Sequence, residues 1–145
     1  MSAIKTITLS ARQVSGYKIE AKARNHVMYI DQPEASGGTD SGPTPLEYQF
    51  ASLASCIITI SHIIARQKHI ELRGINVEVE GPLDTEYFQG KTTEGRAGFI
   101  SICVKVHYDA DLKQEEKEQL LAEVDRRCPI SDNLHHATPI SFIVD

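Results

Sequence analysis

Hydrophobic residues recur at helical spacing along residues 44–68, the longest apolar stretch of the chain. They fall at alternating intervals of four and three, which places them on one face of a helix: Leu46, Phe50, Leu53, Ile57, Ile60 and Ile64. Thr44, Pro45 and Glu47 stand where an N-cap, a first helical residue and a capping-box partner are favoured. After Glu47 no Asp, Glu, Lys or Arg occurs before Arg66. The pattern predicts a helix that starts at Thr44 and is buried on most sides.

The same helix could be interpreted as a membrane span, because a span needs about 20 predominantly apolar residues. Polar residues interrupt this run at short intervals: Gln49, Ser52, Ser55, Thr59, Ser61 and His62. Such interruptions are unfavourable in lipid. We therefore expect a helix inside a folded domain, and no membrane as a partner.

Apolar content and alternation predict six β-strands. These are residues 4–9, 17–23, 26–30, 75–80, 100–108 and 140–144. Turns at Ser15 and Gly16, and at Arg24 and Asn25, join the first three strands into an antiparallel meander. Residues 31–43 are turn formers and predict a flexible loop, whose glycines serve either as a simple connection or as backbone access to a site.

A second helix is predicted between Asp111 and Cys128. Asp111 is a suitable N-cap with Gln114 in the reciprocal position. Pro129 ends the helix at Cys128, since the residue before a proline is disfavoured in the α conformation. Residues 131–138 are expected to form a connector. The apolar side of this helix consists of Leu120, Leu121, Val124 and Cys128.

The predicted element order is β-β-β-α-β-β-α-β, which belongs to the α+β class with antiparallel pairing. The 145 residues, 41% hydrophobic and 24% charged, fit a single domain over residues 1–145. The net charge of −5 and the lack of Lys or Arg runs argue against nucleic acid or an anionic membrane as a partner. Scattered cysteines and an N-terminus without a secretory signal lead us to expect the reducing cytoplasm.

Two cysteines are predicted to face the interior, one from each helix. These are Cys56 and Cys128, whereas Cys103 falls on the polar face of its strand. Ser52 and Thr59 lie one turn either side of Cys56 and could hydrogen-bond its sulfur. A buried cysteine by itself is usually a small hydrophobic residue, so reactivity requires a partner.

Three motifs stand in a defined order: GGTDSGPTP entering the first helix, Ala-Ser-Cys ending at Cys56, and Cys-Pro at Cys128. Together they resemble the OsmC/Ohr family, the osmotically inducible protein C and organic hydroperoxide resistance proteins, over nearly the whole chain. The resemblance implies an OsmC-like intertwined homodimer with strands wrapping two long helices. It also implies a peroxidase that reduces organic hydroperoxides in oxidative stress defence, with Cys56 as the peroxidatic thiolate and Cys128 as the resolving thiol. A dithiol reductant would reopen the resulting disulfide, without metal or organic cofactor.

The resemblance further implies an arginine from the N-terminal strands paired with a glutamate. A buried thiol needs such a cation, because it otherwise keeps its proton. Arg24 is the candidate, with Arg12 as the alternative. In the organic hydroperoxide resistance branch the glutamate would stand at Leu46. Here the glutamate is one position later, at Glu47, and this departure resembles the broader OsmC-like branch. Glu47 either completes a capping box or reaches a site across a dimer interface.

Two other interpretations stay open. One is a non-catalytic dimer that binds an apolar ligand in its interface cleft. The other is a zinc site of Cys56, Cys128 and His135 or His136, which only the residue types support. Apart from any resemblance, the uncharged first helix predicts a homodimer, because the short strands of one chain cannot cover both of its faces.

Overall fold

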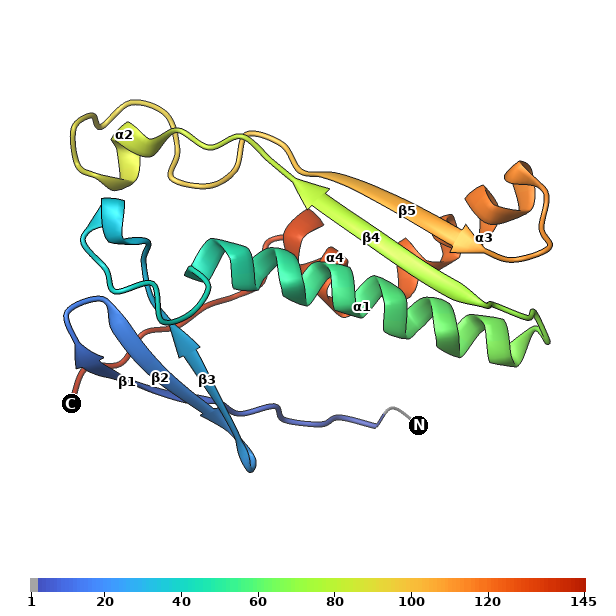
Figure 1. Cartoon of the computed structure of the whole chain (residues 1–145), viewed down its shortest axis with the longest axis horizontal. Coiled ribbons are helices and arrows are strands. Elements are labelled where there is room, and N and C mark those ends of the chain that lie inside the picture. The colour runs from blue at the N-terminus through green and yellow to red at the C-terminus, as the bar shows by residue number, and fades with distance from the viewer. Residues whose placement is uncertain (1–2) are drawn as a thin grey trace. The chain divides into compact units, whose positions relative to one another are not determined.

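The computed structural model describes residues 3–145. Contacts divide the chain into two compact units, residues 1–49 and residues 50–145. The helix α1 (Pro45–Gln67) begins in the first unit and continues into the second. Figure 1 labels the elements in their chain order. The expectation of one domain over the whole chain stays a prediction.

The first unit contains a three-stranded antiparallel sheet in the order β1-β2-β3 (Figure 1). Its strands are β1 (Ser10–Ser15), β2 (Lys18–Ala23) and β3 (His26–Ile30). The turns contain Gly16 and Arg24, both with positive φ angles, of 55° and 54°. The predicted meander and its turn positions are therefore confirmed.

The first predicted strand is displaced along the chain. Residues 4–9 form no strand, and Ile4 and Ile7 are exposed. A tight turn pairs the residues that immediately flank it, so the turn at Gly16 selects Ser10–Ser15 as the partner of β2. The strand predicted for residues 4–9 is therefore wrong for the single chain.

Asp31 organises the segment between β3 and α1. The residue is 1% exposed, and its carboxylate accepts hydrogen bonds from the backbone N–H and the hydroxyl of both Thr39 and Ser41. The Thr39 and Ser41 hydroxyls hold the pKa of Asp31 well below its usual value, although burial acts in the opposite direction. The segment is therefore a hydrogen-bonded loop and not the flexible connection that its composition predicts.

The loop glycines permit close backbone packing. A Cβ on Gly38 would collide with the carbonyl of Gln32, and one on Gly42 with the carbonyl of Tyr29. A short 3-10 helix, η1 (Glu34–Ser36), precedes both glycines in the chain. The glycines are explained by packing, which favours the structural interpretation over access to a site.

The second unit has an apolar core between α1, β5 and α3. The buried cluster consists of Leu53, Ile57, Ile64, Tyr108, Leu120, Val124 and Cys128. Ser61, also on the buried face of α1, shares a hydrogen bond of 2.8 Å with the Tyr108 hydroxyl. By length and composition alone α1 could cross a membrane, but this face of the helix belongs to the core of the unit.

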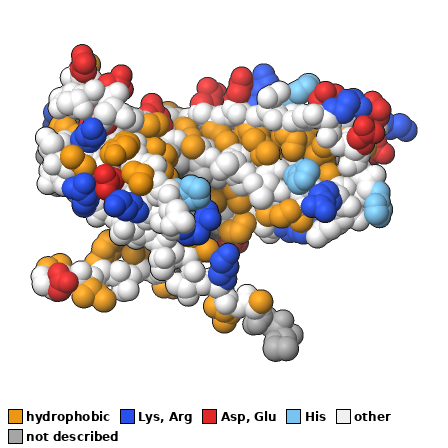
Figure 2. Space-filling view, turned by 60° about the horizontal axis from the view of Figure 1, so that its bottom comes forward, with side chains coloured by type: hydrophobic (Ala, Val, Ile, Leu, Met, Phe, Trp, Pro, Cys, Tyr) orange, Lys and Arg blue, Asp and Glu red, His pale blue; other side chains and the backbone are white. Residues whose placement is uncertain are grey.

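In the single chain only one face of α1 is buried. Ile58 and Ile63 are 37% and 38% exposed, and Leu46, predicted for the core face, is 38% exposed. Hydrophobic side chains are also open to solvent over much of the surface that Figure 2 shows. The expectation of a helix buried on most sides is therefore not met within one chain.

The second unit also contains a two-stranded antiparallel sheet of β4 (Gly74–Glu80) and β5 (Cys103–Asp109). Both strands follow the prediction, except that β5 begins three residues later than residue 100. The connection between them includes the one-turn helix α2 (Thr85–Phe88). An isolated bridge between Leu83 and Phe99 closes this connection.

The second long helix, α3 (Gln114–Arg127), starts later than its predicted cap. Asp111 forms an ion pair of 3.1 Å with Arg73 instead of capping the helix. The capping role passes to Lys113, whose backbone N–H donates to Glu116 at 2.7 Å. The buried side chains Leu120 and Val124 lie on the predicted face.

The chain end differs most from the prediction. Residues 131–138, expected to be a connector, lie largely within the helix α4 (Pro129–His135). Residues 140–144 form no strand, and Phe142, Ile143 and Val144 are more than nine-tenths exposed. A strand needs a pairing partner, and this segment has none among residues 3–145. The α+β class with antiparallel pairing is nevertheless confirmed.

Candidate active site

Cys56 lies near the middle of α1, one residue before the buried Ile57. Its side chain is half-buried and packs against the apolar cluster of the second unit. Thr59, expected as a possible partner of the sulfur, instead donates its hydroxyl to the carbonyl of Ser55 at 2.8 Å. Cys56 is therefore a thiol on a continuous helix, set in apolar surroundings.

Cys128 lies at the break between α3 and α4. Its extended backbone, with φ −83° and ψ 112°, ends α3, and Pro129 then starts α4. The side chain is fully buried, and its Sγ accepts a hydrogen bond of 3.4 Å from the backbone N–H of Ser131. The sulfur thus occupies the place of a serine or threonine oxygen at a helix N-cap.

The two helices bring these cysteines together. Cys128 Sγ and Cys56 Sγ are 2.8 Å apart, and both cysteines are free thiols. A disulfide bond requires about 2.05 Å between sulfurs. The pair can therefore close into a disulfide with a small displacement.

The surroundings of Cys56 favour its protonated form. Burial raises the pKa of the Cys56 thiol, and the hydrogen bond with Cys128 raises it further. The backbone N–H of Ile130, which interacts with the Cys56 sulfur, acts in the opposite direction. A cation near the sulfur would be needed to favour the thiolate near neutral pH.

Cys103 is exposed on β5, where it pairs across the sheet with Glu80. It has the position on the less buried strand face that its sequence context predicts. No group of three or more His, Cys, Asp or Glu side chains within residues 3–145 is arranged to hold a metal ion. The zinc interpretation therefore lacks a ligand set in this part of the chain.

Arg24, Arg12 and Glu47 belong to the first unit, whereas the two thiols belong to the second. Arg24 is exposed in the turn between β2 and β3. Arg12 donates to the Glu20 carboxylate at 3.3 and 3.4 Å. Roles of these residues at the thiol pair stay predictions.

Glu47 forms the capping box that its position predicts. Its carboxylate accepts from the backbone N–H of Thr44 at 2.7 Å, and its own N–H donates to the Thr44 hydroxyl at 3.2 Å. This arrangement accounts for the residue structurally. It does not test a role across a dimer interface.

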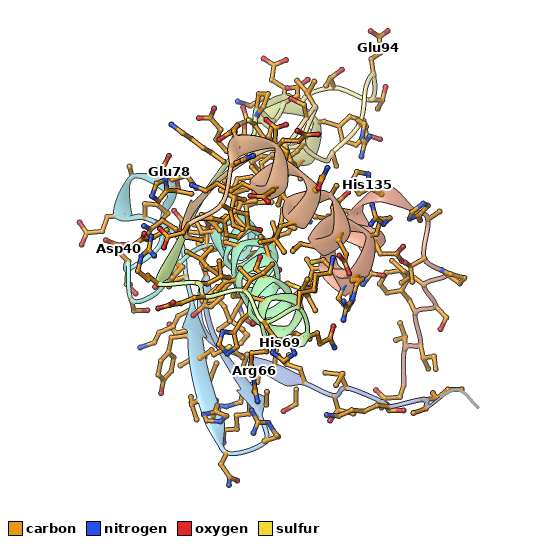
Figure 3. The ribbon with its side chains drawn as sticks, turned by 90° about the vertical axis from the view of Figure 1, so that its right-hand side faces the viewer. Asp40, Arg66, His69, Glu78, Glu94 and His135 are labelled. Carbon is orange, nitrogen blue, oxygen red and sulfur yellow. The ribbon has the colours of Figure 1, made fainter. Side chains whose placement is uncertain are left out.

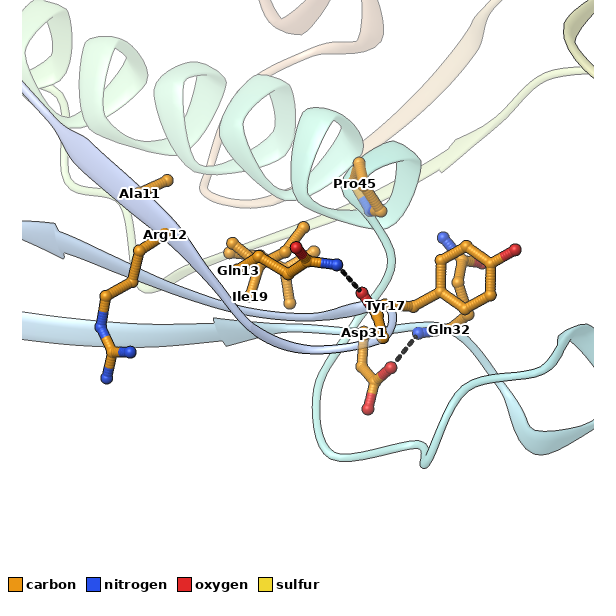
Figure 4. A pocket seen from close by; sticks show the side chains of 10 residues that line it. Ala11, Arg12, Gln13, Tyr17, Ile19, Asp31, Gln32 and Pro45 are labelled. Atoms are coloured by element: carbon orange, nitrogen blue, oxygen red, sulfur yellow. Dashed lines mark hydrogen bonds between the residues drawn. The ribbon is translucent and has the colours of Figure 1, made fainter.

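The first unit also has an open pocket beside the loop of Asp31 (Figure 4). Gln13 crosses it and donates to the carbonyl of Gly16 at 2.8 Å. Asp31 Oδ2 accepts four hydrogen bonds from Thr39 and Ser41, and Oδ1 accepts one from the backbone N–H of Gln32, so the carboxylate is largely engaged within the loop. The lining residues are Ala11, Arg12, Gln13, Gly16, Tyr17, Ile19, Ile30, Asp31, Gln32 and Pro45.

Sequence reasoning missed the groups around the two sulfurs. The backbone N–H groups of Ile130 and Ser131 face them, and the Ser131 hydroxyl donates to Asp125. The one available signal was Pro129 directly after Cys128, because proline is favoured at the first position of a helix. It could have predicted α4 and an N-cap role for Cys128.

A comparison with family models identifies one family. A family model described as OsmC-like protein matches residues 38–142. No curated protein sequence matches the chain. An OsmC-like protein from Mycoplasma pneumoniae has a similar structure, with a TM-score of 0.80 and 20% identity, covering 92% of this chain and 89% of that one.

Two further solved structures carry names that describe a stress response. An organic hydroperoxide resistance protein OsmC from Legionella pneumophila has a TM-score of 0.70 and 21% identity, covering 92% of this chain and 91% of that one. An organic hydroperoxide resistance protein from Elizabethkingia anophelis has a TM-score of 0.66 and 18% identity, covering 94% and 93%. At this identity the similarity establishes the fold.

Proposed function

The chain belongs to the OsmC-like family, and on that premise we propose that it is a thiol peroxidase that reduces organic hydroperoxides with Cys56 and Cys128. The observation that carries the proposal is the distance of 2.8 Å between the two free sulfurs. The names of the similar Legionella pneumophila and Elizabethkingia anophelis proteins support it.

In the first step the Cys56 thiolate attacks the distal oxygen of the hydroperoxide. An S–O bond forms and the O–O bond breaks, so the alkoxide leaves and takes up a proton to become an alcohol. Cys56 is thereby oxidised by two electrons to a sulfenic acid. The apolar cluster beside Cys56 favours an organic tail, since each buried methylene contributes up to about 0.8 kcal/mol.

In the second step Cys128 resolves the sulfenic acid. Its thiolate attacks the Cys56 sulfur, an S–S bond forms, and the hydroxide leaves as water after protonation. A dithiol reductant then returns both thiols by exchange and leaves as its own disulfide. The short sulfur–sulfur distance supports this step, because it places the Cys128 sulfur within reach of Cys56.

The proposed enzyme has a cation that favours the Cys56 thiolate, and it is a homodimer. Arg24, or alternatively Arg12, supplies the positive charge that offsets the raised pKa of Cys56. A homodimer covers the apolar face of α1 that Ile58 and Ile63 leave open. The reducing cytoplasm is the compartment in which both cysteines would rest as thiols.

Peroxide consumption by the purified protein, with dithiothreitol supplied, tests the proposal. We expect catalytic consumption of cumene hydroperoxide, faster than that of hydrogen peroxide. The variant Cys103→Ser is the matched control, because it removes a cysteine outside the pair, and it should keep the wild-type rate. Absence of turnover with an active dithiol present would contradict the proposal.

A further inference from the structure

A side-chain hydrogen bond bridges the break between α3 and α4. The hydroxyl of Ser131 in the first turn of α4 donates to the Asp125 carboxylate in the last turn of α3. Ser131 is only 6% exposed, whereas Asp125 is open to solvent. The same Asp125 oxygen lies 3.7 Å from Nε2 of His135, one turn further along α4. Figure 3 labels His135. The Asp125 carboxylate therefore bonds to the first turn of α4 and lies near the side chain of its last residue.

The tied turn carries the backbone groups that face the sulfurs. N–H groups of the first helical turn have no partner within the helix. Here the Ser131 N–H donates to Cys128 Sγ, and the Ile130 N–H interacts with the Cys56 sulfur. The direction in which α4 leaves α3 thus sets where these N–H groups meet the two sulfurs.

We propose that Asp125 and Ser131 are positioning residues for the Cys56–Cys128 pair. Their bond fixes the first turn of α4, which keeps the two sulfurs within bonding reach. Without it Cys128 samples more orientations, and the intramolecular disulfide loses part of its advantage over exchange with an external thiol. The kinetic part of this inference, a slower resolving step, rests on the proposed function, whereas the equilibrium part does not.

The equilibrium between thiols and disulfide measures the positioning directly. In a glutathione buffer, Cys56 and Cys128 are oxidised by one glutathione disulfide, which leaves as two glutathione thiols. We expect Ser131→Ala and Asp125→Ala each to lower the equilibrium constant for disulfide formation about tenfold, equal to a rise of about 30 mV in potential. The double variant should show no more than either single one, because both remove the same bond.

Two variants distinguish the loss of the Ser131–Asp125 hydrogen bond from a general loss of negative charge. Asp125→Asn keeps an acceptor oxygen and should stay within about twofold of wild type. Asp132→Ala removes a neighbouring exposed carboxylate of α4 that pairs with His136, and it should also leave the equilibrium unchanged. Should Ser131→Ala fail to fold, Asp125→Ala carries the test, because Asp125 is exposed.

An unchanged equilibrium constant in Asp125→Ala, or an equal change in Asp132→Ala, would overturn the inference. In stopped-flow measurements the Asp125→Ala variant should convert its sulfenic acid to the disulfide about tenfold more slowly than wild type. A wild type that exchanges with glutathione but consumes no peroxide would refute the proposed function alone. Failure of the positioning inference and failure of the proposed function are therefore distinguishable.

Discussion

At Cys56 the immediate neighbours work against the thiolate. Burial and Cys128 both raise the pKa of the thiol, and the Ile130 N–H lowers it. Near pH 7 a thiol with a raised pKa holds less thiolate than an ordinary cysteine, so its reaction rate should increase as the pH rises toward that pKa. Catalysis at neutral pH therefore requires a charge from outside this group of residues.

Replacing the arginines shows which one supplies the charge. We expect Arg24→Ala to raise the pKa of Cys56 further, and hence to slow its alkylation by iodoacetamide at pH 7 by about tenfold or more. Arg12→Ala is the matched control, because its guanidinium is bound to Glu20. Slower alkylation in Arg12→Ala with a normal rate in Arg24→Ala would transfer the role to Arg12.

Oxidation should link Cys56 to Cys128 and leave Cys103 as a free thiol. The first two sulfurs are 2.8 Å apart, and Cys103 is exposed on β5. Peptide mapping after one equivalent of cumene hydroperoxide measures the pairing. A major bridge to Cys103, or one between subunits, would be incompatible with the site described.

At this scale the sequence could predict the two cysteines but not what surrounds them. Helix phase places Cys56 and Cys128 on inward faces, and the resemblance to a known family predicts that they act as a pair. The bond from Ser131 to Asp125 depends on the angle between α3 and α4, which no spacing along the chain encodes. The hydrogen bond between Ser131 and Asp125 therefore became apparent only from the structure.

At the scale of elements, substitutions of Glu47 can separate its role in capping α1 from a role in catalysis. Glu47→Ala should destabilise the protein by about 1 kcal/mol, because both bonds of the capping box are lost or weakened. Glu47→Gln keeps an acceptor and should retain most of the stability in urea unfolding. Peroxidase activity that falls in Glu47→Gln, at unchanged stability, would mean that the carboxylate also serves the site.

The interior elements could be predicted because their patterns agree with local start and stop signals. Thr44 caps α1, Pro129 ends α3, and the strands β2, β4 and β5 alternate in sequence as half-buried strands do. The two terminal strand predictions, residues 4–9 and 140–144, are wrong for the single chain. Alternation reports that a segment has an apolar face, but it does not supply the neighbour with which that segment would pair.

At the scale of the whole molecule, the exposed apolar face of α1 predicts self-association. Ile58 and Ile63 are more than a third exposed on a helix that carries no formal charge between Glu47 and Arg66 apart from any protonated histidine. Light scattering at micromolar concentration should give twice the chain mass of 16.1 kDa. Ile58→Glu with Ile63→Glu should shift the protein toward monomer, whereas a wild type of 16.1 kDa would contradict the homodimer.

The central claim is that Cys56 attacks the peroxide and Cys128 resolves the product. Stopped-flow mixing with cumene hydroperoxide, without reductant, tests it most directly in wild type, Cys56→Ser and Cys128→Ser. We predict one rapid turnover ending in a disulfide for wild type, one turnover ending in a sulfenic acid for Cys128→Ser, and no peroxide consumption for Cys56→Ser. Consumption at the wild-type rate by Cys56→Ser would contradict the account.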